Sequence, residues 1–248
     1  MTENWDFYFC NVDHKPGSIF VDLGALELLP VATHPVMAYL RLRMCTPRPD
    51  GLSSNEEYDR LLAIEHALEK LCVEGDTIYV GRCTTNGCRD FYFYTVEGLA
   101  WDELIGAFMA AFPDYQFQVG CRDDPSWSSY CSFLYPNEAT RHGMRNRRVC
   151  TELERHGDPL LVAREIDHWA YFPEVNGRDK FVAKTVQLGF AVRGLSTSEH
   201  DGMHCAQLWR LDLPNMSDID DVTLPLFDLA AESGGQYDGR ESVVLGTE

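Results

Sequence analysis

The sequence is short of positive charge and has no long hydrophobic run. It has 21 lysines and arginines against 39 aspartates and glutamates, which gives 248 residues a net charge of −18. Such an excess disfavours direct binding to nucleic acid or to anionic membrane surfaces, because both depend on basic side chains. No stretch approaches the ~20 apolar residues that span a bilayer, and residues 1–6 lack the features of a signal peptide. We therefore expect a soluble, cytoplasmic protein.

Recognisable catalytic motifs are also missing. The sequence contains no Gly-rich phosphate loop, nucleophile elbow or zinc-protease helix. Its nine cysteines, an odd number without an export signal, favour reduced thiols over a disulfide framework. The sequence therefore predicts a non-enzymatic protein without a cofactor.

The same order of elements, strand–helix–strand–strand–helix–strand, is predicted twice. In the first half it runs from Val36 to Cys121, and in the second from Glu165 to Leu245. Hydrophobic residues make up 45% of the chain, enough for real cores. Such layouts form α+β modules with one open sheet face, a surface that often binds partners.

In the first half, Asn86-Gly87 is the strongest hairpin signal, because both residues tolerate the positive φ of a type I′ turn. Ser53–Cys72 is the most clearly predicted helix. It has an apolar stripe, and Ser54 with Glu57 fits a capping box at its start. Trp5–Val12 and Ile19–Leu23 predict a preceding hairpin. The other predicted elements are a helix at Trp101–Phe112 and strands at Val36–Met44, Thr77–Thr85, Cys88–Val96, Tyr115–Cys121 and Trp127–Tyr135.

The second half contains one conflict. Ser217 is the expected N-cap of its last helix, but Pro225 falls inside that helix and is expected to kink or restart it. The predicted helices are Arg178–Leu188 and Ser217–Ser233, and the predicted strands are Glu165–Phe172, Phe190–Leu195, His204–Leu213 and Gln236–Leu245.

The charge distribution follows the predicted domains, residues 1–135, 136–160 and 161–248. Their net charges are −11, +1 and −8. The middle segment has no clear apolar stripe, and we interpret it as a partly helical linker whose arginines dock against acidic neighbours. These arginines are Arg141, Arg145, Arg147 and Arg148. The acidity of the flanking domains either only keeps the protein soluble or suits a cationic protein partner.

Three groups of residues resemble chemical sites, and for none of them is catalysis or metal binding the favoured interpretation. Across the Asn86-Gly87 turn, Cys83 and Cys88 are expected to be diagonal neighbours roughly 7–8 Å apart, too far for a disulfide. Packing is therefore favoured over a metal or redox role. His200, His204 and Cys205 lack the fourth ligand of a structural zinc site, so no metal is predicted.

The third group is Asp167-His168-Trp169. Adjacent residues of a strand point to opposite faces of the sheet, so this aspartate and histidine cannot readily form a catalytic dyad. We interpret the group as a recognition element.

The second module, residues 161–248, resembles the regulator of ribonuclease E activity B (RraB) family. The resemblance rests on the order and spacing of short motifs: Glu165-Ile166-Asp167-His168 with Trp169 and Phe172, Leu188-Gly189-Phe190, Leu229-Ala230 in an acidic amphipathic helix, and Tyr237-Asp238-Gly239. The first module, with Trp5-Asp6-Phe7-Tyr8, looks like an uncharacterised bacterial domain that is often fused ahead of an RraB-like domain.

The resemblance implies a ferredoxin-like βαββαβ fold for the second module. Because the same order of elements is predicted twice, we expect two tandem modules of this kind with open antiparallel sheets. It also implies a non-catalytic inhibitor that binds ribonuclease E and modulates RNA turnover. Similar modules often end in a long acidic tail, whereas this chain departs from that pattern at Val243–Glu248. We therefore expect this chain to share the fold of the RraB family more fully than it shares the family's binding partner.

Together these observations predict an acidic regulator that binds a basic protein surface, and the resemblance implies ribonuclease E as the partner. The alternative is an enzyme or small-ligand binder with a site between the modules, using linker arginines and aromatics such as Trp127, Tyr130 and Trp169. A third possibility is that the first module only protects or positions the second. The candidate partner-binding residues are Asp167, His168, Trp169, Asp218, Asp220, Asp221, Tyr237 and Asp238.

Overall fold

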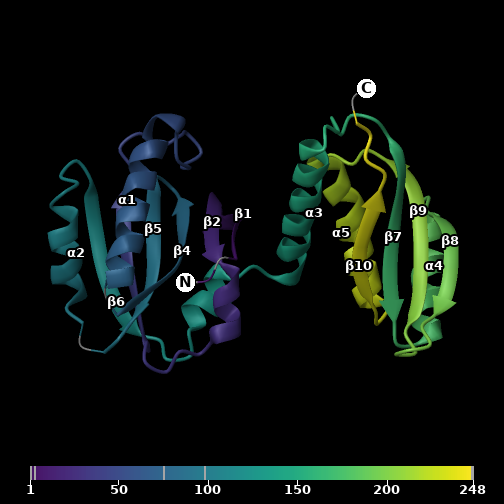
Figure 1. Cartoon of the computed structure of the whole chain (residues 1–248), viewed down its shortest axis with the longest axis horizontal. Coiled ribbons are helices and arrows are strands. Elements are labelled where there is room, and N and C mark those ends of the chain that lie inside the picture. The colour runs from purple at the N-terminus through teal and green to yellow at the C-terminus, as the bar shows by residue number, and fades with distance from the viewer. Residues whose placement is uncertain (1, 3, 75, 98, 247–248) are drawn as a thin grey trace. The chain divides into compact units, whose positions relative to one another are not determined.

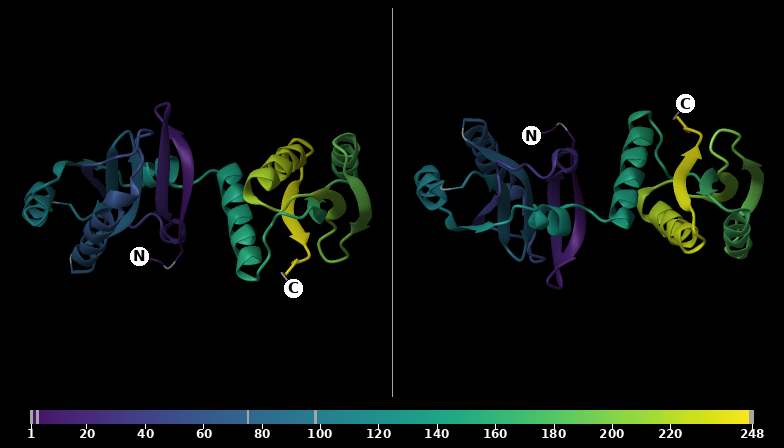
Figure 2. Two further views of the ribbon diagram at one scale, coloured as in Figure 1. Left: turned by 90° about the horizontal axis from the view of Figure 1, so that it is seen from above. Right: turned by 90° about the horizontal axis from the view of Figure 1, so that it is seen from below.

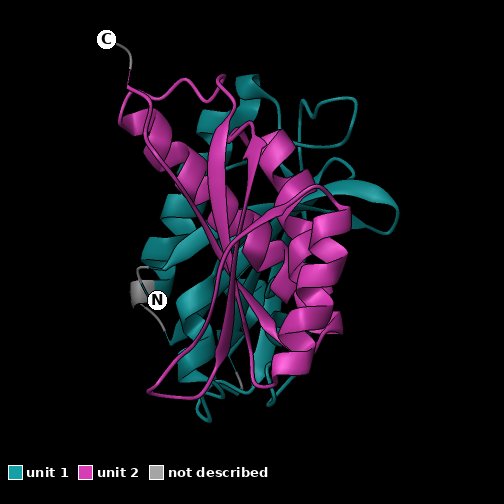
Figure 3. Cartoon of the chain, turned by 90° about the vertical axis from the view of Figure 1, so that its right-hand side faces the viewer, with its two compact units in different colours: residues 1–136 teal, residues 137–248 magenta. Residues whose placement is uncertain are grey.

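Two open antiparallel sheets form from different parts of the chain, so the protein is α+β (Figure 1). The computed structural model describes residues 2, 4–74, 76–97 and 99–246. It divides the chain into two units, residues 1–136 and 137–248, which are distinguished by colour in Figure 3. Residues 1 and 3 of the predicted polar N-terminus, and 247 and 248 at the other end, lie outside the described residues.

Unit 1 contains a βαββαβ motif extended by a hairpin. The motif, β3–α1–β4–β5–α2–β6, confirms the predicted order, and the sheet runs β1-β2-β4-β5-β3-β6. The hairpin β1–β2 therefore adds two strands beyond β4. The elements are β1 Trp5–Val12, β2 Lys15–Asp22, β3 Val36–Arg43, α1 Asn55–Glu74, β4 Thr77–Thr85, β5 Cys88–Thr95, α2 Trp101–Met109 and β6 Gln116–Asp123.

Helices α1 and α2 bury their apolar stripes on one face of this sheet. Leu61 of α1 and Ile105 of α2 are fully buried with Leu40 of β3 and Phe91 of β5. This agreement between helical and strand periodicity is why the sequence predicts these elements well. Helix α1 starts at Asn55 rather than at the predicted Ser53, and the carboxylate of Glu57 accepts hydrogen bonds from the backbone amides of Cys45 and Thr46, each at 2.8 Å.

The prediction of a strand at Trp127–Tyr135 is wrong. Residues Tyr130–Leu134 form a π-helical turn, η2, and a 3₁₀ helix, η1, spans Leu23–Leu28. Aromatic residues in this segment pack as core rather than in a strand: Trp127 stacks on Tyr94 with 3.8 Å between ring centres, and the Tyr130 hydroxyl donates to the carbonyl of Asp22 at 2.6 Å. The aromatic content of this segment led to the wrong prediction of a strand, because aromatic side chains are common both in strands and in buried loops.

Unit 2 contains the second βαββαβ motif, β7–α4–β8–β9–α5–β10, preceded by helix α3. Its sheet runs β10-β7-β9-β8, so the four strands of the motif lie in the order fourth, first, third, second. The motif strands of unit 1 have the same order, β6-β3-β5-β4. This is the ferredoxin-like arrangement. The elements are α3 Glu138–Arg155, β7 Arg164–Phe172, α4 Val175–Gln187, β8 Ala191–Thr197, β9 His204–Asp212, α5 Met216–Glu232 and β10 Gln236–Ser242. Helices α4 and α5 lie on one side of this sheet (Figure 2).

The segment expected to be a linker is helix α3, which packs in unit 2. Its residues Cys150 and Leu153 belong to the same buried cluster as Ile166 of β7 and Leu226 of α5. The apolar stripe is hard to recognise because polar residues share the buried face. Asn146 is only 3% exposed, and its amide donates to the hydroxyl of Thr223 at 2.7 Å. Its satisfied hydrogen bonds allow a polar side chain to occupy a core position.

Helix α5 is continuous through Pro225. The proline lies on the exposed side of the helix, where water can bond the carbonyl that the missing N–H leaves free. The N-cap is Asn215 rather than the predicted Ser217, and its side chain accepts from the backbone amide of Asp218 at 3.1 Å. Asparagine is among the residues that cap best at this position.

Candidate protein-binding face

Strand β7 divides the predicted recognition residues between two faces of the unit 2 sheet. Along it, Ile166, His168 and Ala170 point into the core. Asp167 and Trp169 therefore point to the opposite face, together with Tyr171, and all three are half-buried. The alternation in sequence places one strand of aromatic and acidic side chains on the open side of the sheet.

Strand β9 supplies the neighbouring row. Its register pairs Trp209 with Asp167, Gln207 with Trp169 and Cys205 with Tyr171, so these side chains share one face. We define the open face of unit 2 by its central residues, which are Asp167, Trp169, Tyr171, Arg193, Gln207 and Trp209. The rows of side chains on β7 and β9 thus make a surface with both hydrophobic and charged character.

One guanidinium organises the charges of the open face. Arg193 of β8 lies 2.6 Å from the Asp167 carboxylate and 2.7 Å from that of Glu165, and its Cζ lies 5.0 Å from the Trp209 ring centre. Gln207 donates to Asp167 at 3.1 Å. Glu241 of β10 pairs opposite Asp167. Arg193 is thus shared by two carboxylates, and Glu241 adds a third on the β10 side of Asp167, so the charges of these four side chains sum to a negative value.

Two predicted partner-binding residues, His168 and Tyr237, cannot contact a partner, because they are only 1% and 2% exposed. They share a hydrogen bond of 2.8 Å between Nδ1 and the phenol oxygen. Burial, assisted by the positive charge of Arg240, lowers the pKa of His168 to about 3. The histidine is thus a neutral part of the core. A short run of motif residues did not distinguish this role from recognition, because burial depends on segments distant in the sequence.

The acidic residues of α5 do not join the open face. Asp218 and Asp221 are exposed on this helix, whereas Asp220 is half-buried and accepts a hydrogen bond from the Asn146 amide at 2.7 Å. Burial raises the pKa of Asp220 above its ordinary value. Because α5 packs on the core side, the sheet separates these aspartates from Asp167 and Trp169. Asp238 is exposed at the irregularity of β10 between Tyr237 and Gly239.

Several residues of the open face were not predicted as site residues: Tyr171, Arg193, Gln207 and Trp209. The period of two in the segments 164–172 and 204–212 could have identified three of them, since it places Tyr171 with Trp169 and aligns Gln207 with Trp209. Arg193 could not be found in this way, because its strand contains a register shift between Val192 and Gly194.

The predicted register of Cys83 and Cys88 is confirmed. Cys83 pairs with Asp90 and Thr85 pairs with Cys88, which makes the two cysteines diagonal neighbours. Within the part of the chain that the structure describes, no three histidine, cysteine or acidic side chains gather as metal ligands would. Over the same residues, none of the helices combines the length and the apolar character of a membrane span.

Comparisons with known proteins divide the chain in the same way. Residues 3–135 match the "Family of unknown function (DUF695)", and residues 144–241 match "Regulator of ribonuclease activity B". No curated protein matches the chain.

Similar solved structures include a candidate glycine cleavage system transcriptional repressor, which is 8% identical with a TM-score of 0.28 over 84% of this chain and 98% of its own. Another is an unknown protein from Galdieria sulphuraria, 13% identical with a TM-score of 0.24 over 85% and 99% of the two chains.

Proposed function

We propose that this chain, which belongs to the DUF695 family through residues 3–135 and carries a Regulator of ribonuclease activity B domain at residues 144–241, regulates a ribonuclease by binding it, without catalysing a reaction itself. The family match of unit 2 carries the proposal. It is supported by the ferredoxin-like topology of that unit, in which the helices cover one face of the sheet and leave the other open.

In this proposal the open face of unit 2 is the contact surface. Trp169 and Trp209 supply the large aromatic anchors that dominate many interfaces. Glu165, Asp167 and Glu241 supply negative charge, which steers a basic partner and fixes its orientation. The inferred partner is a basic protein surface, with the arginine-rich scaffold region of ribonuclease E as the first candidate. The exposed Asp218 and Asp221 of α5 and Asp238 of β10 add negative charge that attracts a basic partner at long range.

The test is calorimetric titration of the full chain with the arginine-rich scaffold region of ribonuclease E at low and physiological salt. The expected result is binding that weakens as salt rises, because exposed charges are screened over about 8–10 Å. Replacement Trp169→Ala is expected to weaken binding about tenfold or more. Absence of binding at both salt concentrations would refute ribonuclease E as the partner.

Two double variants with the same change of charge locate the surface. Glu165→Gln with Glu241→Gln removes two negative charges from the open face, whereas Asp218→Asn with Asp221→Asn removes two from the exposed side of α5. The proposal expects the first pair to lower affinity more than the second. If the α5 pair has the larger effect, the helix rather than the open face is the contact surface. Asp220 is unsuitable for this comparison because its bond to Asn146 supports the fold.

A further inference from the structure

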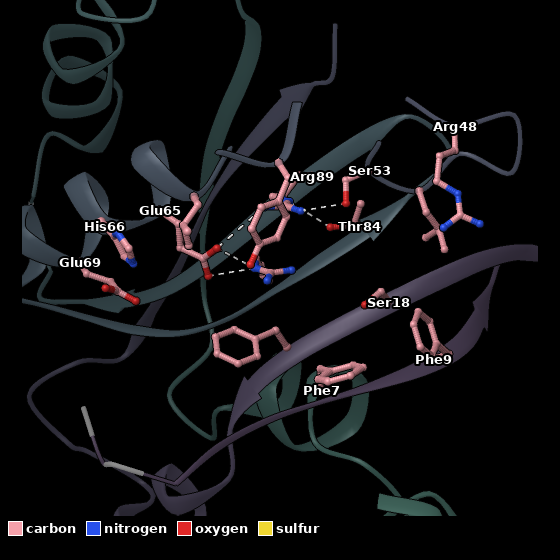
Figure 4. Close-up of a pocket in the computed structure, with 15 residues that line it drawn as sticks. Phe7, Phe9, Ser18, Arg48, Ser53, Glu65, His66, Glu69, Thr84 and Arg89 are labelled. Carbon is pink, nitrogen blue, oxygen red and sulfur yellow. Dashed lines mark hydrogen bonds and ion pairs between the residues drawn. The ribbon is translucent and has the colours of Figure 1, made fainter. Parts of the chain in front are cut away.

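A groove in unit 1 lies beside α1, where the hairpin β1–β2 carries the sheet beyond the helix. Its volume is about 490 Å³, a size that suits a small molecule. Side chains of α1 form one wall, and those of β1, including Phe7 and Phe9, form the other (Figure 4). Strands β2, β4 and β5 supply the floor between them, with Ser18, Thr84 and Arg89. The groove therefore exists because the hairpin widens the βαββαβ motif on the α1 side.

The floor contains buried charged groups that share their partners. Arg89 and Glu65 are only 2% and 3% exposed. The Glu65 carboxylate accepts 2.8 Å hydrogen bonds from Arg82 and from the Tyr79 hydroxyl, and the Arg89 guanidinium lies 3.9 Å from it. The guanidiniums of Arg82 and Arg89 thus both lie beside the Glu65 carboxylate. Burial, followed by repulsion from Arg82, lowers the pKa of Arg89 to about 10. Glu65 and Glu57 act in the opposite direction, and an anion held beside Arg89 would favour its charged form in the same way.

Hydroxyl groups beside Arg89 are arranged to donate. The guanidinium donates to the Thr84 hydroxyl at 3.1 Å and to the Ser53 hydroxyl at 3.3 Å. Because both oxygens accept from arginine, their own hydrogens are free to point to another acceptor in the groove. Arg48, held to Asp50 at 2.5 Å, lies at the same end (Figure 4). Guanidinium and hydroxyl donors gathered in this way bind phosphate or carboxylate groups well.

Exposed aromatic side chains line both walls of the groove. Phe9 is 67% exposed and Tyr58 50%, and Phe7 makes an edge contact with Phe9 at 5.7 Å between ring centres. These rings lie outside the main core cluster of unit 1. Large apolar side chains that stay exposed beside buried charges suggest a ligand with a flat apolar part. The acids Glu65 and Glu69 lie toward the other end of the groove from Arg48, which leaves the arginine end for an anion (Figure 4).

We propose that this groove binds a small organic anion, a phosphate or carboxylate attached to a planar ring. The anionic group contacts Arg48, Arg89 and the hydroxyls of Ser53 and Thr84, and the ring packs against Phe7 and Phe9. This site belongs to unit 1 and does not depend on ribonuclease binding by unit 2.

The experiment is calorimetric titration of the full chain with phenyl phosphate, benzoate, AMP, inorganic phosphate and uncharged phenol. At least one of the three ring-bearing anions is expected to bind with a millimolar or lower Kd, and phenol is expected not to bind. Arg48→Gln is expected to weaken that binding about tenfold, because hydrogen bonds to charged groups are strong. Phe9→Ala is expected to weaken the ring-bearing anion but not inorganic phosphate.

Arg43→Gln is the matched control, since it removes the same charge from an exposed site on β3 that does not line the groove. Both Arg48 and Phe9 are exposed, so their replacement is not expected to impair folding, which circular dichroism would check. Failure of phenyl phosphate, benzoate and AMP to bind at millimolar concentration would overturn the proposal. So would binding that Arg48→Gln and Arg43→Gln weaken equally, or inorganic phosphate binding as tightly as phenyl phosphate.

Discussion

At the scale of single residues, buried polar groups stabilise the fold most where all of their polar atoms are hydrogen-bonded. Asp124 of unit 1 is 4% exposed and accepts hydrogen bonds from the backbone amides and hydroxyls of Ser128 and Ser129 and from the Tyr94 hydroxyl. These bonds hold the pKa of Asp124 far below its ordinary value despite burial, which acts in the opposite direction. The carboxylate therefore secures the loop that replaces the predicted strand.

We expect Asp124→Asn to lower the free energy of unfolding of unit 1 by about 2–3 kcal/mol, because the amide nitrogen would face donors. A depressed carboxyl pKa stabilises the fold above the unfolded pKa near 4, and that stabilisation is lost as pH falls further. The difference between variant and wild type should therefore be full at pH 7 and shrink below about pH 4. Urea unfolding followed by tryptophan fluorescence measures it, with the exposed Asp123→Asn as the control.

Two buried histidines make unit 2 sensitive to acid. Burial lowers the pKa of His168 to about 3 and that of His142 to about 4. Because the unfolded chain binds these protons near pH 6.5, stability should fall below that pH by roughly 1.4 kcal/mol per pH unit for each histidine. We expect His168→Gln to reduce this slope between pH 6 and 4.5, whatever its effect at pH 7. An unchanged slope in urea titrations would show that His168 is protonated in the folded state.

At the scale of elements, α3 shows how a helix can belong to a core without an obvious apolar stripe. Cys150 and Leu153 enter the core of unit 2, while His142 and Asn146 occupy buried positions beside them. We expect Leu153→Ala to destabilise unit 2 by about 2–4 kcal/mol, the usual range for a buried leucine. Removing the helix, in a fragment of residues 161–248, should expose enough apolar surface to bind a hydrophobic dye. The exposed Val149→Ala on the same helix is the control.

At the scale of the whole molecule, each unit has its own buried cluster and its own sheet. We therefore expect fragments 1–136 and 137–248 to fold separately, each with a cooperative unfolding transition. Calorimetry of the two fragments tests this expectation. A fragment 1–136 that folds only in the presence of 137–248 would contradict it and would support a chaperoning role between the units.

Most of the fold could be predicted because its signals are local. Alternation in the segment 164–172 and the apolar stripe of 55–74 each report a period that short-range geometry imposes, and Asn86-Gly87 reports a turn type. The candidate site was less accessible. Asp167 and Trp169 reach the open face, but His168 and Tyr237 lie in the core, and the sequence did not indicate Arg193 as their neighbour.

The order of the elements, the repetition of the βαββαβ motif and the acidity could be read from the sequence, because periodicity is local and net charge follows from composition. Only the tertiary structure decided which polar groups are buried and which distant side chains meet. The placement of α3 on α5, and of Arg48, Arg89 and Phe9 around one groove, required packing between segments far apart in the chain. Such contacts depend on the net balance of burial and hydrogen bonding, which no local pattern records.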